Sequence, residues 1–225
     1  MDPSSGKLLA IADQEGFVTI LQTDRILPYS VRLDPGGQRP RAAWEAHKNL
    51  VHDLCWAKAD SRLYTASGDS TVAVWDTSCA TRLATGVEHQ LSVKCLTAFG
   101  PGGDLFASGS RDGSILVWDV RLPGRRARMA DGSSASTLAC VWKAEGILSL
   151  SVTPQGDRLL VHCASGPHLL YSARAPQSGA LATFHYPPSA HPANNRHKWF
   201  IRTAFSPDGT AFVAGAADST AYVWQ

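Results

Sequence analysis

Apolar and polar residues alternate in short runs along most of the chain, and each run is bounded by residues that favour turns. Four stretches show the pattern well: HDLCWAKADSRLYTAS, VKCLTAFGPGGDLFAS, LSLSVTPQGDRLLVHC and RTAFSPDGTAFVAG. Period-two alternation between Gly, Pro, Asp and Ser is typical of antiparallel strands joined by tight turns. Because no segment has a convincing helical period, the pattern predicts an all-β fold.

One strand–turn–strand unit recurs, with an acidic residue six positions before a tryptophan. The three clear copies are TASGDSTVAVWD, ASGSRDGSILVWD and AGAADSTAYVW, whose acid and tryptophan are Asp69 and Trp75, Asp112 and Trp118, and Asp218 and Trp224. The weaker copy IADQEGFVTILQ has Glu15 and Leu21 in these places, and HCASGPHLLY keeps an aromatic, Tyr171, without the acid. Successive units lie 43 to 54 residues apart, so the sequence predicts five copies of one structural unit.

Histidines precede the three clear copies: His47, His89 and His191. This spacing of histidine, turn acid and tryptophan resembles the WD40 repeat, which builds a β-propeller from four-stranded blades. The resemblance implies that each blade joins an imidazole, a strand hydroxyl, an acid and an indole N–H in one buried hydrogen-bonded chain. The predicted sets are His47, Ser67, Asp69 and Trp75; His89, Ser108, Asp112 and Trp118; and His191, Asp218 and Trp224. Histidines used in this way are structural, not catalytic.

The chain is predicted to be a single propeller domain, 1–225, that is incomplete. The stretch 122–146 is rich in arginine and serine and too short for a further blade, so it is expected to be an insert loop. Five repeat positions compare with about seven in the closed rings that the resemblance implies. One internal blade is therefore expected to be missing, and the ring is expected not to be closed by an outer strand of its own.

The composition and the absence of certain motifs exclude several classes of function. The net charge of +2 over 225 residues predicts no direct sequence-specific binding of nucleic acid and no membrane partner. The five cysteines are odd in number and widely spaced, which predicts reduced thiols that are mostly buried. An intracellular protein is expected because no apolar run is long enough for a membrane span and the first residues do not resemble a signal peptide. The sequence contains no P-loop, nucleophile elbow or metal-binding pair of histidines. His52 and Asp53 could be drawn into a triad, but they lie within a repeat. We therefore expect no enzyme, no catalytic or metal-binding residues and no cofactor.

A finer resemblance comes from LLAIADQEGFVTILQT, WEAHKNLVHDLCW, SRLYTASGDSTVAVWD, GSRDGSILVWDVR and FSPDGTAFVAGAADSTAYVW. These stretches are similar to the propeller of the denticleless family, the substrate receptors of cullin-4 RING ubiquitin ligases. The resemblance implies substrates that are replication and cell-cycle proteins presented on the sliding clamp. It also implies a nuclear location, with the cytoplasm as the alternative. A general WD40 scaffold for chromatin or signalling complexes is the competing interpretation.

The segment Trp118-Asp119-Val120-Arg121 matches the WDxR form with which such receptors dock onto the ligase's propeller adaptor, the damage-specific DNA-binding subunit. By that resemblance Arg121 offers a planar guanidinium to the adaptor. The alternative is a solvated arginine at the end of a strand. Because Arg121 lies beyond the turn acid and the indole, its replacement by alanine is predicted to leave stability nearly unchanged. Further arginines follow at Arg125, Arg126 and Arg128. They fit a nuclear-import signal, a contact with an acidic partner or a solvated loop.

Overall fold

The computed structural model describes residues 6–23, 41–57, 62–100, 103–121, 138–139, 146–164, 167–175, 178–187, 201–216 and 219–225. The strands in these residues form five antiparallel sheets, and no α-helix is found among the described residues. No helix of the described part of the chain is long and apolar enough to cross a membrane. The all-β prediction is confirmed.

The sheets follow one another along the chain. Sheet A contains β1 (Leu8–Ala12), β2 (Phe17–Gln22) and β3 (Ala42–Glu45). Sheet B contains β4 (Val51–Trp56), β5 (Arg62–Ser67), β6 (Val72–Asp76) and β7 (Thr81–Gly86). Sheet C contains β8 (Val93–Phe99), β9 (Leu105–Ser110), β10 (Ser114–Asp119) and β11 (Leu138–Ala139). Sheet D contains β12 (Ile147–Val152), β13 (Arg158–Cys163), β14 (His168–Ser172) and β15 (Ala180–Phe184). Sheet E contains β16 (Thr203–Phe205), β17 (Phe212–Gly215) and β18 (Ala221–Trp224).

The five sequence copies occupy one equivalent position in the five sheets. In every sheet the tryptophan, tyrosine or leucine of the copy lies directly opposite an apolar residue of the preceding strand. The pairs are Leu9 with Leu21, Leu63 with Trp75, Phe106 with Trp118, Leu159 with Tyr171, and Phe212 with Trp224. A shared register at this position means that the five sheets are repeats of one blade.

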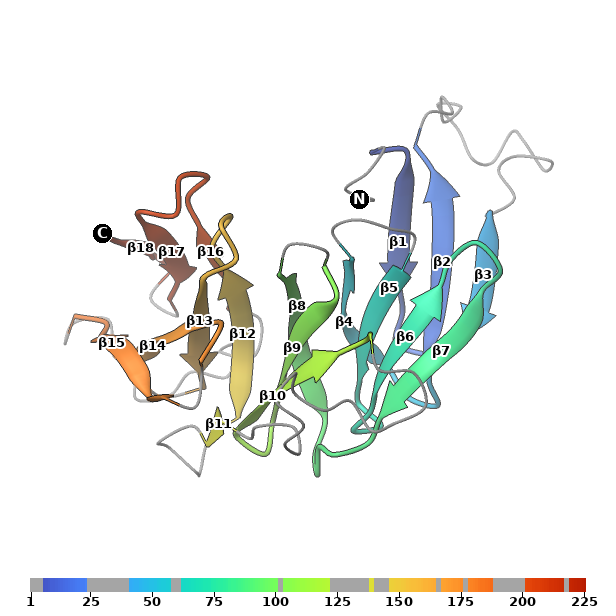
Figure 1. The fold of residues 1–225 in the computed structure, drawn as a ribbon, viewed down its shortest axis with the longest axis horizontal. Coiled ribbons are helices and arrows are strands. Elements are labelled where there is room, and N and C mark those ends of the chain that lie inside the picture. Colours follow the sequence, from blue (N-terminus) through green and yellow to red (C-terminus); the bar gives the residue numbers. More distant parts are fainter. Residues whose placement is uncertain are drawn as a thin grey trace.

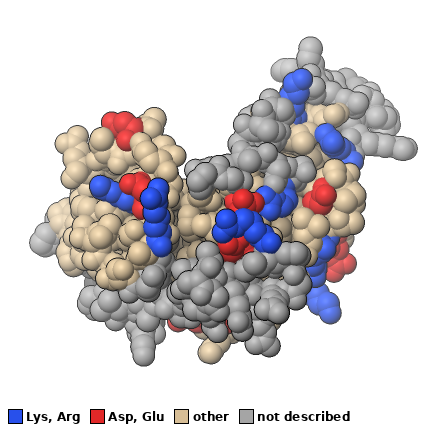
Figure 2. All heavy atoms as spheres, in the orientation of Figure 1, with Lys and Arg blue, Asp and Glu red and all other residues tan. Residues whose placement is uncertain are grey.

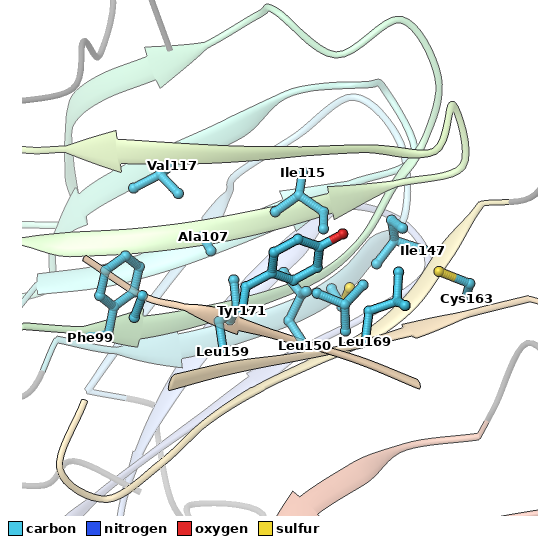
Figure 3. Packing of buried hydrophobic residues seen from close by; sticks show 13 residues of the cluster. Phe99, Ala107, Ile115, Val117, Ile147, Leu150, Leu159, Cys163, Leu169 and Tyr171 are labelled. Carbon is cyan, nitrogen blue, oxygen red and sulfur yellow. The ribbon is translucent and has the colours of Figure 1, made fainter. Parts of the chain in front are cut away.

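The core is divided into layers between neighbouring sheets, because each inner sheet buries both of its faces. Representative buried residues are Leu63 and Trp75 between A and B, Tyr64 and Trp118 between B and C, Ile147 and Tyr171 between C and D, and Leu160 and Phe212 between D and E. Figure 3 shows the layer between sheets C and D, with Tyr171 among Ile115, Leu150 and Leu169. Alternation along each strand therefore supplies apolar side chains to two layers at once.

The sheets are arranged in an arc, from sheet A at one end to sheet E at the other (Figure 1). The first strands of successive sheets, β4, β8, β12 and β16, pack side by side along it. Sheets B, C and D have four strands each. In the described residues, sheet A has no strand equivalent to β4, and sheet E has none equivalent to β7. The propeller is incomplete and does not close into a ring.

The segment between sheets C and D bears on the expected missing blade. Sheet D packs directly on sheet C through β12, β8 and β9, so no blade stands between them. Leu138–Ala139, inside the predicted insert loop, pair with Ser114 and Ile115 as the outermost strand of sheet C. Residues 122–137 and 140–145, which include Arg125, Arg126 and Arg128, lie outside the described residues.

Candidate functional site: the polar clusters and the Arg121 strand end

Sheet B contains a buried hydrogen-bonded chain that runs from a tryptophan to a carboxylate. The Trp75 indole N–H donates to Thr65 Oγ1 at 3.0 Å, and Thr65 Oγ1 lies 2.8 Å from His47 Nε2. On the other side of the ring, His47 Nδ1 lies 3.1 Å from Asp69 Oδ2. Burial lowers the pKa of His47, and this effect is larger than the attraction of Asp69, which raises it. The imidazole is therefore neutral at pH 7. It accepts the threonine O–H at Nε2 and donates from Nδ1.

Sheet C repeats this chain with serine in the place of threonine. Trp118 Nε1 donates to Ser108 Oγ at 2.7 Å, and Ser108 Oγ lies 2.7 Å from His89 Nε2. His89 Nδ1 lies 2.9 Å from Ser114 Oγ and 3.6 Å from Asp112 Oδ2, and Ser114 donates its hydroxyl proton to Asp112. Here the acid is reached through Ser114. Burial lowers the pKa of His89 to about 4, so this histidine is also neutral at pH 7.

The assignment of Ser67 to the first set is wrong. Ser67 Oγ accepts the backbone N–H of Asp69 at 3.1 Å and donates to the carbonyl of Leu50 at 3.0 Å. It stabilises the turn, as Ser110 does in sheet C by accepting the N–H of Asp112. Thr65 and Ser108 both stand four residues before the turn acid. Thr65 and Ser67 are two residues apart and therefore lie on the same face of β5. The bridging residue is identified by its distance along the sequence from the turn acid.

The third predicted set is only partly within the described residues. His191 and Asp218 lie outside them. Trp224 stacks on Phe212, with ring centroids 4.8 Å apart and planes 12° apart. Four residues before Asp218 stands Ala214, which is fully buried and has no hydroxyl. Sheet E therefore cannot repeat the chain through a side-chain oxygen at that position.

Arg121 is bound to its own blade. Its Nε donates to Asp119 Oδ1 at 2.9 Å and Nη2 donates to Oδ2, while its backbone N–H donates to Oδ1 at 3.0 Å. The Asp119 side chain is 2% exposed and that of Arg121 is 56% exposed. The hydrogen bonds from Arg121 are the main reason that the pKa of Asp119 is lowered. The premise that Arg121 lies outside the hydrogen bonds of its own blade is wrong. Because alanine would remove side-chain donors from a buried carboxylate, we now expect Arg121→Ala to lower stability.

The equivalent position in sheet B shows what the blade itself requires. Asp76 follows Trp75 as Asp119 follows Trp118, and two residues later Ser78 donates both its backbone N–H, at 2.8 Å, and its hydroxyl to Asp76 Oδ1. A serine is therefore sufficient to hold the strand-end aspartate. Arg121 shares the backbone bond, replaces the hydroxyl bond with two guanidinium bonds to both carboxylate oxygens, and adds an exposed cationic group.

Two further charged residues lie near this strand end. Arg62, at the start of β5, donates from Nη2 to Asp104 Oδ1 at 2.6 Å, which joins sheet B to sheet C. Asp104 also raises the pKa of Arg121 by charge attraction, after the larger effects of Asp119. Arg62, Asp104 and Arg121 therefore form a charged strip across the ends of two sheets.

Sequence reasoning did not find a second polar cluster, at the opposite strand ends. It joins His52 and Asp53 of β4 to Lys94 of β8 and to Arg202, which precedes β16. His52 and Asp53 were visible as a pair, but the other members are 42 and 149 residues away along the chain. No local spacing could indicate that they meet.

The remaining candidate chemistry is limited. Among the described residues, no group of three or more His, Cys, Asp or Glu side chains is placed to hold a metal ion. Cys95 and Cys163 are buried, Cys55 is half-buried and Cys79 is exposed, and none of these four forms a disulfide. Burial raises the pKa of the Cys55 and Cys95 thiols, which makes both poor nucleophiles. Cys140 lies outside the described residues.

Comparison with known proteins agrees with the repeats. The family model "WD domain, G-beta repeat" matches residues 38–76, 80–119 and 193–225. A denticleless protein homolog from Danio rerio is 36% identical over 116 residues, covering 50% of this chain and 16% of that protein. The denticleless protein homolog from Homo sapiens is 35% identical over 119 residues, covering 53% of this chain and 15% of that protein.

A longer match is found with the protein lethal(2)denticleless of Drosophila melanogaster, which is 25% identical over 297 residues, 97% of this chain and 37% of the fly protein. The chain thus spans between about a sixth and two-fifths of the length of these relatives. Since 97% of the chain is about 218 residues, about 79 of the 297 aligned positions have no residue of this chain. This number is close to two repeats of about 40 residues, in agreement with five sheets in place of about seven.

Proposed function

Because the chain belongs to the denticleless family of WD40-repeat proteins, we propose that it is a substrate-recognition subunit of a cullin-4 RING ubiquitin ligase. In this role it carries no catalytic residue. It holds a substrate on one surface and the ligase adaptor on another, so that the ubiquitin-transferring subunits of the ligase reach the substrate. The substrates we propose are replication and cell-cycle proteins presented on the sliding clamp, and the proposed location is the nucleus.

The observation that carries the proposal is the way in which Asp119 holds Arg121. Two nitrogens of the guanidinium bond to a buried carboxylate, while more than half of the side chain is exposed. A long side chain that is held in one orientation before binding loses less rotamer entropy in the complex. Arginine held in this way is suited to carboxylates and carbonyl oxygens of a partner.

The surroundings of Arg121 also support docking at this end of the blade. The Arg62–Asp104 pair is partly buried, with side chains 20% and 31% exposed, so it is fixed in place beside the guanidinium. Three charged groups at fixed positions favour a partner surface whose charges are opposite at each position, and they disfavour surfaces that bring like charges together. We propose that Trp118 supports this surface from the core, that Asp119 positions Arg121, and that Arg121 contacts the damage-specific DNA-binding adaptor.

Titration of purified adaptor against this chain tests the docking role. Arg121→Ala is expected to weaken binding at least tenfold, which corresponds to about 1.4 kcal/mol. Arg121→Lys is expected to recover only part of the affinity, because an ammonium retains the charge but not the planar fork. Arg121→Gln separates the two roles of the residue, since its amide can still donate to Asp119 while the charge is lost. It is expected to melt closer to wild type than Arg121→Ala, yet to bind as weakly.

The matched control is Arg158→Gln in sheet D, where Arg158 is exposed and lies 3.9 Å from Asp157. It removes one positive charge in the neighbouring sheet, outside the strip formed by Arg62, Asp104 and Arg121, and should leave adaptor affinity unchanged. Equal affinity of wild type and Arg121→Gln would contradict docking through Arg121. Affinity capture from nuclear extract distinguishes the wider alternatives: recovery of cullin-4 with its adaptor supports the receptor role, and recovery of chromatin or signalling components alone supports a general scaffold.

A further inference from the structure

A cavity of about 500 Å³ lies where the end of sheet A meets sheet B. One wall is the segment after β3, which includes Lys48. The other wall belongs to sheet B, with Asp69 in the turn before β6 and with Arg82 and Thr85 on β7. A volume of this size is typical of sites that take a small ligand or side chains of a partner. The cavity is separate from the Arg121 surface, because Arg121 follows the far end of β10, the strand of sheet C equivalent to β6.

Arg82 is held in one orientation at the wall of the cavity. Its Nη2 donates to the carbonyl of Ala46 at 2.5 Å, and its Cζ lies 4.7 Å from the centroid of the Trp75 ring, a cation–π contact. A guanidinium has five N–H donors. In the part of the chain that the structure describes, the carbonyl of Ala46 is the only acceptor bonded to them. Arg82 therefore keeps donors for a ligand.

Asp69 has one acceptor position left over. Its Oδ1 accepts the backbone N–H of Thr71 at 2.9 Å and the hydroxyl of Thr71 at 2.6 Å, and its Oδ2 lies 3.1 Å from His47 Nδ1. A carboxylate has about four acceptor positions, so one position on Oδ2 is open. The Asp69 side chain is 22% exposed. Asp69 and Arg82 both line the cavity, but they form no ion pair with each other.

Sheet C shows which donor suits the open position. There Oδ2 of the turn acid Asp112 accepts the backbone N–H of Gln90 at 2.8 Å. Gln90 is the residue after the histidine of the buried chain, and Lys48 holds that position in sheet B. The backbone N–H of Lys48 makes no such bond to the described residues. The fold thus places an amide donor on this carboxylate in sheet C and leaves the equivalent place open in sheet B.

The charges that line the cavity balance. Arg82 and Lys48 are cationic, and Asp69 and Glu45 are acidic. Lys48 and Glu45 are exposed, and within the described residues their side chains make no hydrogen bond or ion pair. Figure 2 shows Lys and Arg beside Asp and Glu on the face that it draws, without one large patch of a single sign. Net charge therefore selects no ligand here, and the groups of a ligand must match each charge locally.

We propose that the cavity binds a carboxamide side chain, asparagine or glutamine, on a segment of a partner protein. The amide oxygen accepts from Arg82, and the amide N–H donates to the open position of Asp69. A carboxylate or phosphate would bring like charge to Asp69, and an ammonium would bring like charge to Arg82. At the rim, Lys48 and Glu45 bind a carbonyl and an N–H of the segment's main chain. This site goes beyond the proposed ligase role and does not depend on it.

Nuclear magnetic resonance titration of the full chain, labelled with ¹⁵N, tests the proposal. The signals to follow are the Arg82 Nε–H and the Trp75 indole N–H, which lie at the cavity wall and directly behind it. The probes are capped pentapeptides that differ only in the central residue: glutamine, asparagine, glutamate, lysine or methionine. The better of the two amide peptides is expected to bind about tenfold more tightly than the other three, because it alone matches both charged groups.

Two variants test the cavity itself. Arg82→Met keeps an unbranched chain over the indole but removes the N–H donors, and it is expected to weaken binding of the amide peptide about tenfold. Thr85→Phe blocks the cavity with a larger side chain at an exposed position whose hydroxyl makes no hydrogen bond to the described residues. It should abolish binding and keeps the test valid if Arg82→Met melts below wild type. Arg158→Gln in sheet D is the control and should bind as wild type does.

Three results would overturn the proposal: equal affinity for the five peptides, no shift of either signal with both amide peptides, or unchanged affinity in both variants. Adaptor titration of Thr85→Phe is expected to match wild type. Loss of the amide site and loss of adaptor docking are therefore measured separately.

Discussion

The buried hydrogen-bonded chain of sheet B leads to a specific prediction for Thr65→Val. Valine has nearly the shape of threonine but no hydroxyl. Thr65 is fully buried, and its oxygen is the partner of both Trp75 Nε1 and His47 Nε2, whose side chains are also buried. Removing it leaves an indole donor and an imidazole nitrogen without a partner in the core.

The size of the effect follows from these two groups. Each buried polar group left without a partner costs about 1–3 kcal/mol, and the added methyl recovers part of it, so the net loss is about 2–4 kcal/mol. For a chain of this size each kcal/mol lowers the melting temperature by about 2–4 °C, which predicts a decrease of about 5–15 °C. Circular dichroism melting curves measure it.

Two controls make the prediction specific to the hydroxyl. Thr65→Ser keeps the oxygen and loses only a methyl, so it should cost about 1 kcal/mol. Ser108→Ala in sheet C removes the oxygen that contacts Trp118 and His89, and it should resemble Thr65→Val. If Thr65→Val melts at the wild-type temperature, the oxygen does not bridge the indole and the imidazole, and the chain is not a stabilising feature of the blade.

Other predictions follow from the backbone, the packing and the histidines. Gly109→Ala should destabilise by about 1–3 kcal/mol in urea denaturation, because its Cβ would lie 2.5 Å from Ile147 Cγ2; unchanged stability would show that sheets C and D can move apart. Ser70 has a φ of 71°, so Ser70→Gly should raise stability by up to about 1 kcal/mol by removing strain, and a lower melting temperature would refute this. Burial lowers the pKa of His89 and His162 to about 4, below the value of about 6.5 in an unfolded chain. The contribution of these histidines should therefore be constant above about pH 6.5 and fall as the pH decreases towards 4, because the unfolded chain binds protons that the folded chain excludes; equal melting temperatures at pH 7 and pH 5 would contradict it.

The local fold was predictable because it depends on short-range patterns. Alternation assigns side chains to the two faces of a strand, and Gly, Asp and Ser mark the turns, so each hairpin is encoded within about a dozen residues. The recurrence of the aromatic residue then identified equivalent positions, and Trp75, Trp118, Tyr171 and Trp224 share one register. The identity of the bridging hydroxyl was also within reach of the sequence, because both Thr65 and Ser108 stand four residues before the acid.

The tertiary structure decided what the polar side chains at the sheet ends contact. The sequence suggested that the blade makes no use of Arg121. The turn of the chain after β10 places its guanidinium on Asp119. The cluster of His52, Asp53, Lys94 and Arg202 depends on sheets B, C and E being placed around one end of the arc, which joins Arg202 to Asp53 across 149 residues. Side-chain alternation encodes which face a residue takes within its own sheet, but it contains no information on how far apart three separate sheets lie. That distance is set by the apolar layers between them, and a charged cluster that spans several sheets exists only once those layers have packed.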